Sequence, residues 1–269
     1  MSTNIFVYEF RARLRSVIIW SLSLIALVFF LFSIFPAFAD QAAQLTQMMA
    51  KFPPALLEAF GMNNADLSTL MGFFSFILVF VELCLAIQAS NYGFGLVSIE
   101  ETELTADFLL TKPVSRIQVI TGKLLAAFCS LLVTDLVVCV TTFISISMFN
   151  GGRTYDMTTL VLLMVSMLIL QIFFLGVGLV ISLLVKRVRS VTPYSMALAF
   201  GMYVLAAFSG MLGEVNLEYI TPFKQLDPAY IVKNAAYNTP LLLLNVVITL
   251  IAIGASYWLY IRRDIHAVS

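Results

Sequence analysis

Six long apolar segments constrain the fold of this chain more strongly than any other feature of its sequence. Each is close to the roughly 20 mainly apolar residues that a helix needs to cross a bilayer. Charged residues make up only 11% of the chain, against roughly 25% in soluble domains, which excludes a soluble fold. The sequence therefore predicts an all-α membrane protein with one transmembrane domain over residues 1–269. The predicted spans are 17–38, 69–91, 124–148, 159–185, 192–213 and 241–261.

The distribution of basic residues predicts the orientation of these spans, because Lys and Arg accumulate on the cytoplasmic side of membrane proteins. A cytoplasmic N-terminus assigns eleven basic residues to inner segments and four to outer ones. We therefore expect both termini to be cytoplasmic. The inner residues are Arg11, Arg13, Arg15, Lys112, Arg116, Lys123, Lys186, Arg187, Arg189, Arg262 and Arg263, and the outer ones are Lys51, Arg153, Lys224 and Lys233.

The N-terminal stretch 4–15 has an amphipathic pattern of its own. Its aromatic and leucine side chains recur every four residues, and two arginines lie on another side: Phe6, Phe10, Leu14, Arg11 and Arg15. This pattern predicts a helix that lies in the membrane interface with its basic groups among the headgroups. The alternative is a frayed cytosolic tail.

The segment between the second and third spans is unusually acidic for so apolar a chain. Glu100, Glu103 and Asp107 are spaced three and four residues apart, which places them on one helical face. Leu104 and Phe108 form an adjacent apolar strip. The pattern predicts a short amphipathic helix at the cytoplasmic surface, with an ordinary solvated loop as the alternative.

A proline turn and a helix start follow this acidic stretch. Pro113 disfavours helix at Lys112, and Ser115 with Gln118 matches a capping box at the start of a new helix. We expect that helix to continue past Lys123 into the third span. Together the two parts predict a rigid cytoplasmic element over residues 98–116.

Two stretches of the chain resemble the ABC-2 type permeases, the membrane subunits of ATP-binding-cassette exporters. The run DFLLTKPVSRIQVITGK (107–123) is similar to the signature of that family, and FPPALLEAFGM (52–62) resembles the segment after its first span. Six spans and an N-terminal interfacial helix agree with the family, so the resemblance covers essentially the whole chain. One departure is Leu104, where such permeases often have glycine.

The resemblance implies that the segment between spans 2 and 3 is a coupling helix that contacts a separate ATP-binding subunit. The residues expected at that contact are Glu100, Glu101, Glu103, Asp107, Leu109, Leu110, Lys112, Pro113 and Arg116. It also implies a second permease copy or a sister permease, and a location in the plasma (inner) membrane of a bacterium. The balanced formal charge gives no bulk attraction to nucleic acid.

The chain itself carries no motif for ATP hydrolysis or other catalysis. A GxxxxGK[ST] phosphate loop is absent, and neither HExxH nor GxSxG occurs. We therefore expect the chain not to be an enzyme and to have no cofactor or metal of its own. ATP and Mg²⁺ would belong to the partner subunit.

Two acidic residues, Glu82 and Asp135, fall inside predicted spans, where an ionised carboxylate costs at least roughly 2.5–3.5 kcal/mol. With Gln88 and Gln171 they are candidates for a polar translocation path. The alternative is that they make hydrogen bonds between helices that hold the bundle together. A further alternative function is an ion-coupled secondary transporter that uses both acids.

Overall fold

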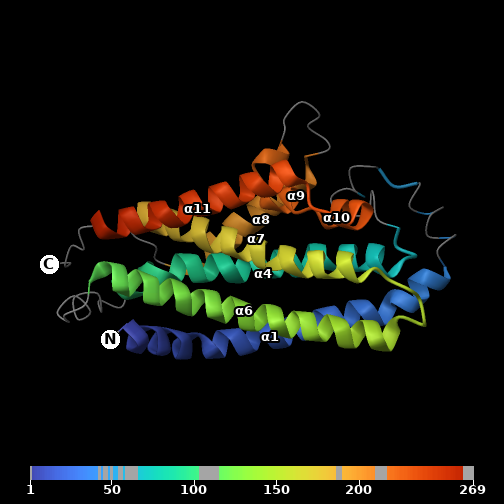
Figure 1. Ribbon diagram of the computed structural model, residues 1–269, viewed down its shortest axis with the longest axis horizontal. Helices are drawn as coiled ribbons and strands as arrows, with labels where there is room; N and C mark the ends of the chain where they lie inside the picture. The colour runs from blue at the N-terminus through green and yellow to red at the C-terminus, as the bar shows by residue number, and fades with distance from the viewer. Residues whose placement is uncertain are drawn as a thin grey trace.

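The computed structural model is helical throughout the residues that it describes (Figure 1). These residues are 2–41, 66–102, 115–185, 190–209 and 217–262, with 44, 48, 51–53 and 57. Every regular element in these ranges is a helix, which agrees with the predicted all-α class. The predicted tight link between the fourth and fifth spans, at 186–189, lies outside the described residues.

Five of the described helices are long and apolar enough to cross a membrane. They contain five of the six predicted spans, and each extends beyond the predicted limits on at least one side. The five helices are α1 (Ser2–Asp40), α4 (Leu70–Thr102), α6 (Arg116–Phe149), α7 (Met157–Leu184) and α11 (Thr239–Arg262).

The remaining predicted span, the fifth along the chain, forms a shorter helix, α8 (Val191–Ala207), of 17 residues. At 1.5 Å per residue it is about 26 Å long, against roughly 30 Å for the hydrocarbon core of a bilayer. Residues 208–209 are a turn, so the predicted span 192–213 is not a helix over its full length.

The helices α1, α4, α6 and α7 run in alternating directions along one axis, and α11 runs in the same direction as α7 (Figure 1). Ser2, at the start of α1, and Arg262, at the end of α11, lie at the same end of the bundle, which we call the terminal end. The opposite end, where α1 ends and α4 begins, is the far end. Both chain ends are at the terminal end, and the chain returns toward the far end between α7 and α11, where α8 lies in the sequence.

The N-terminal residues 4–15 do not form a helix separate from the first span. Those residues form the first turns of α1, which continues without a break into the first span. No glycine or proline interrupts the helix before Pro36, so its backbone hydrogen bonds continue. Contacts described below hold these turns against α4 and α6.

The second span is also longer than predicted. Residues 98–102, the first part of the predicted contact element, are the last turn of α4 and not part of a separate helix. Helix α4 therefore carries Glu100 and Glu101 directly on its C-terminal end, with no hinge between them and the span.

The prolines in the segment 214–240 predict a partly ordered loop, but its described residues, 217–240, are mostly helical. They form η1 (Leu217–Tyr219), α9 (Pro222–Gln225) and α10 (Pro228–Asn234). Pro222 and Pro228 each occupy the first turn of a helix, where the missing N–H costs nothing. The Asp227 carboxylate accepts a hydrogen bond from the N–H of Ala229 at 2.9 Å and caps α10.

Buried polar contacts hold α9 between α8 and α11. The Thr221 hydroxyl donates to the carbonyl of Met202 in α8 at 2.9 Å. Asn245 of α11 donates through Nδ2 to Gln225 Oε1, also at 2.9 Å. Gln225 and Asn245 are almost completely buried, so these contacts fix the position of α9 beside the end of α8.

The helices α4 and α7 approach each other closely at Gly93 and Gly178. A Cβ atom added at Gly93 would lie 2.5 Å from the carbonyl oxygen of Leu175 and 3.0 Å from the amide nitrogen of Leu179. Gly178 similarly faces the carbonyl of Ser90, at 3.2 Å from its would-be Cβ. Small residues permit such backbone contact between membrane helices.

We expect Gly93→Ala to destabilise the bundle by about 1–3 kcal/mol, because the added methyl group forces α4 away from α7. Thermal unfolding in detergent measures the effect. Gly201→Ala and Gly254→Ala are the controls, since nothing lies within 4 Å of a Cβ at either position. These should be neutral or stabilising by up to about 1 kcal/mol. Equal effects at all three positions would contradict the close approach.

Candidate functional site

The predicted contact element lies at the terminal end of the bundle, between α4 and α6. Its two flanks are described: Glu100 and Glu101 lie in the last turn of α4, and Arg116 is the first residue of α6. The other predicted contact residues lie outside the described residues: Glu103, Asp107, Leu109, Leu110, Lys112 and Pro113.

The capping box predicted at the start of α6 is confirmed. The N–H of Gln118 donates to Ser115 Oγ at 3.3 Å, and the N–H of Ser115 donates to Gln118 Oε1 at 3.2 Å. The guanidinium of Arg116 donates to the carbonyl of Ile261 at 2.9 Å. These bonds give the chain a defined entry into α6 and tie that entry to the end of α11.

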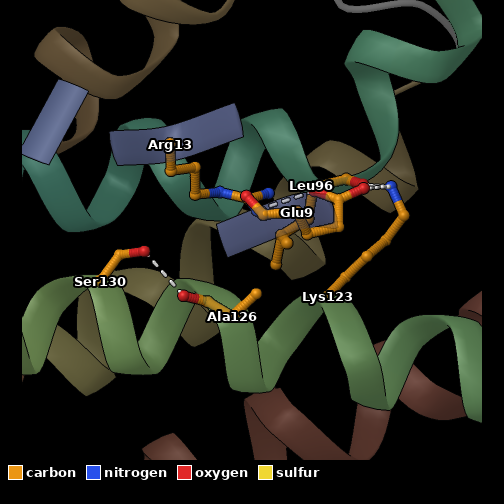
Figure 2. A network of polar contacts seen from close by, with 6 residues as sticks. All are labelled: Glu9, Arg13, Leu96, Lys123, Ala126 and Ser130. Carbon is orange, nitrogen blue, oxygen red and sulfur yellow. Dashed lines mark hydrogen bonds and ion pairs between the residues drawn. The ribbon is translucent and has the colours of Figure 1, made fainter. Parts of the chain in front are cut away.

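A cluster of charged side chains joins α1, α4 and α6 at the same end (Figure 2). We call Glu9, Arg13, Lys123 and the carbonyl of Leu96 the ionic junction. Lys123 Nζ lies 3.2 Å from Glu9 Oε1 and donates to the carbonyl oxygen of Leu96 at 2.7 Å. Arg13 Nη1 donates to Glu9 Oε2 at 2.7 Å. Glu9 thus accepts from two cations on two helices.

In the ionic junction Lys123 is buried, and Glu9 and Arg13 are mostly buried. Side-chain exposure is 3% for Lys123, 14% for Glu9 and 12% for Arg13. Buried charges at such sites need partners, because removing an ion from water costs several kcal/mol. Leu96 lies one to two turns before the end of α4, so the junction fixes the part of α4 that leads into the contact element.

A chain of polar contacts continues from the junction into the bundle. The guanidinium of Arg13 lies 5.9 Å from the ring centroid of Tyr92, whose hydroxyl donates to Ser16 Oγ at 3.2 Å. Gln88 donates through Nε2 to the Tyr92 hydroxyl at 3.3 Å and to Thr134 Oγ1 at 2.9 Å. Polar contacts therefore connect α1, α4 and α6 over several turns.

Asp135 and Gln171 form a polar pair between α6 and α7. In the amide orientation that hydrogen bonding favours, Gln171 Nε2 lies 2.9 Å and 3.2 Å from the two carboxyl oxygens of Asp135. Gln171 is completely buried, and Asp135 is 6% exposed. Asp135 follows Thr134, so this pair lies at nearly the same level as the contact between Gln88 and Thr134.

Glu82 lies about 9 Å farther along α4 from Gln88, toward the far end. It is buried, and the Ser166 hydroxyl of α7 lies 3.4 Å from its Oε1 atom. Tyr237, before α11, donates to the carbonyl of Leu162 at 2.6 Å. Burial and the nearby Glu82 carboxyl raise the pKa of Tyr237 to about 12, so this hydroxyl remains a neutral donor.

The four residues predicted for a translocation path are therefore brought together on α4, α6 and α7. Each has a polar partner on a neighbouring helix of the same chain. Such contacts fit the alternative that these residues make hydrogen bonds between helices. Among the residues that the structure describes, no group of three metal-ligating side chains is present.

We expect Asp135→Asn to leave stability within about 0.5 kcal/mol of the native value, because asparagine can still bond to Gln171. Asp135→Leu should cost about 1 kcal/mol, since it leaves Gln171 without that partner in an apolar bundle. Thermal unfolding in detergent measures both, and Asp135→Leu combined with Gln171→Leu should recover part of the loss. A normally folded Asp135→Asn variant without transport activity would show that the carboxylate acts in transport.

The sequence pattern alone does not predict the ionic junction. A partial signal was present, because Glu9 and Arg13 are four residues apart, the spacing of an ion pair on a helix. A second signal was Lys123, a charged residue inside the helix predicted to start after Ser115 and immediately before the predicted span 124–148. Only the structure brings the pair and the lysine together, since it shows that α1 packs beside α6.

A comparison with protein-family models agrees with this architecture. A model described as "ABC-2 family transporter protein" matches residues 3–265. The search among curated proteins found no match.

Proposed function

The chain belongs to the ABC-2 transporter family, and from that premise we propose that it is the membrane subunit of an exporter driven by a separate ATP-binding subunit. The observation that carries the proposal is the family match over nearly the entire chain. Five membrane-length apolar helices fit a multi-pass transporter subunit. ATP and Mg²⁺ would bind to the partner, since the chain has no phosphate loop.

The proposed docking site for the ATP-binding subunit is the 98–116 element. Its flanks support this role, because α4 ends and α6 begins there with rigid contacts on both sides. Closure of the ATP-binding subunits would push on this element. The ionic junction would then pass the movement from α4 to α1 and α6, since Lys123 contacts both Leu96 and Glu9.

We propose six passages through the membrane, with α8 as the fifth. Its 17 residues are near the lower limit for a span, and α9 packs beside its end. The excess of basic residues at the terminal end supports cytoplasmic termini. In a bacterium this corresponds to the inner membrane. Two copies, or this chain with a sister permease, would enclose the substrate path.

An ion-coupled secondary transporter is the weaker alternative. It would use Glu82 and Asp135 for coupling, yet both acids have hydrogen-bonding partners inside the bundle. The family match favours the ATP-driven function.

Co-expression with candidate ATP-binding subunits tests the proposed function. We expect one of them to co-purify with the chain, and the complex in liposomes to hydrolyse ATP at a rate different from that of the ATP-binding subunit alone. Transport by the purified chain in liposomes without any ATPase, driven by a proton or sodium gradient, would overturn the proposal.

A further inference from the structure

The first turns of α1 present two opposite charged faces. Glu9 and Arg13 point into the ionic junction. A second set of residues recurs at three- and four-residue spacing and therefore shares the outward face. The outward residues are Tyr8, Arg11, Arg15, Ile18, Ile19 and Leu22, and all are exposed.

Arg11 and Arg15 form a pair of guanidinium groups one helical turn apart, with Cβ atoms about 5–6 Å from each other. In the part of the chain that the structure describes, neither has a hydrogen-bond or ion-pair partner, whereas Arg13 is bonded to Glu9. Guanidinium groups bind phosphate through two parallel hydrogen bonds. The pair is therefore suited to a phosphate group that approaches from outside the bundle.

The outward face becomes apolar immediately beyond Arg15. Ile18, Ile19 and Leu22 are 56%, 55% and 61% exposed, and Leu22 lies about 10 Å along the helix from Arg15. Tyr8, which is 74% exposed, lies on the N-terminal side of the arginines along α1. Its amphipathic ring is typical of the membrane interface. A phospholipid whose phosphate binds to the two arginines would place its acyl chains along Ile18 and Ile19.

In the part of the chain that the structure describes, the exposed carboxylates of a second copy do not fit this face as the anionic partner. The exposed acidic side chains among the described residues are Asp40, Asp66, Asp156 and Glu218. The first three lie at the far end of the bundle, and Glu218 lies beyond the C-terminal end of α8. Copies related by an axis normal to the membrane keep each residue at its own depth. These carboxylates therefore cannot reach Arg11 and Arg15.

We propose that Arg11 and Arg15 bind the phosphate of an acidic phospholipid, with Tyr8 at the headgroup level and Ile18, Ile19 and Leu22 against its acyl chains. The bound lipid fixes the N-terminal turns of α1 at the membrane surface, on the side opposite the ionic junction. This inference does not depend on the proposed partner subunit.

The test is a titration of the purified full chain with phosphatidylglycerol, and with phosphatidylcholine of the same acyl chains, followed by native mass spectrometry. Each arginine should contribute about fivefold to the affinity for the acidic lipid. Arg11→Gln with Arg15→Gln should therefore weaken phosphatidylglycerol binding about thirtyfold and leave phosphatidylcholine binding unchanged. Replacing both arginines with lysine should recover part of the affinity, because charge remains but the planar fork is lost.

The matched control removes two positive charges at the far end, by Arg153→Gln with Lys233→Gln, and should bind phosphatidylglycerol as the native chain does. The proposal is overturned if the Arg11/Arg15 variant binds the acidic lipid with native affinity, or if the control loses as much. It is also overturned if millimolar inorganic phosphate displaces the lipid, which would indicate a site for free phosphate. Native lipid binding with loss of a co-purifying ATPase would assign the pair to a protein contact instead.

Discussion

Glu9→Leu is expected to destabilise the bundle by about 3–5 kcal/mol, because it leaves Arg13 and Lys123 buried without their shared carboxylate. Lys123→Met should cost less, about 1–3 kcal/mol, since Glu9 keeps its bond to Arg13 at 2.7 Å. Thermal or denaturant unfolding in detergent, followed by circular dichroism, measures both variants.

The double variant, Glu9→Leu with Lys123→Met, distinguishes a direct interaction between the two charges from independent losses of packing. It removes one anion and one cation together, so its cost should be smaller than the sum of the two single costs. Glu218→Leu is the control, because this exposed carboxylate should change stability by less than about 0.5 kcal/mol. If Glu9→Leu were as mild as Glu218→Leu, the ionic junction would not hold α1 to α6.

Leu109→Asp combined with Leu110→Asp is expected to abolish co-purification of the ATP-binding subunit. Apolar anchors at the centre of an interface typically contribute 2 kcal/mol or more, which corresponds to at least about a thirtyfold loss of affinity. The ratio of ATPase to permease after purification measures the effect. The bundle should keep its native unfolding temperature, because these residues lie between α4 and α6 and outside both helices.

A control for this variant places the same charges between α1 and α4, whose adjacent ends lie at the far end of the bundle. Met48 and Phe52 are 59% and 50% exposed and lie between α1 and α4. Met48→Asp with Phe52→Asp should leave co-purification unchanged. Equal loss in both variants would mean that added charge disturbs the membrane protein in general and that the 98–116 element has no special role.

The sequence predicted most of the helices because their signals are local. Apolar length gave five of the spans, and the Ser115–Gln118 spacing gave the start of α6, which the structure confirms. The prolines of 214–240 predicted a loop, but Pro222 and Pro228 begin helices there instead of interrupting them. The pattern in 4–15 predicted a helix separate from the first span, but these residues continue into α1, where Glu9 and Arg13 pair with each other and Glu9 pairs with Lys123 of α6.

The contacts of the site depend on which helices are neighbours, and this information is not local. Glu82, Gln88, Asp135 and Gln171 were recognisable as polar residues in apolar segments, but their partners on adjacent helices were not. Lys123 is the clearest case, because its importance comes from Leu96 and Glu9, which are 27 and 114 residues away in the sequence.

The central claim is that the 98–116 element docks a separate ATP-binding subunit, and site-specific photocrosslinking in membranes tests it most directly. A photoreactive amino acid at Leu109 or Leu110 should crosslink to a co-expressed ATP-binding subunit, and one at Met48 should not. The absence of crosslinks from 103–114 with an ATPase that still co-purifies and supports transport would contradict the claim.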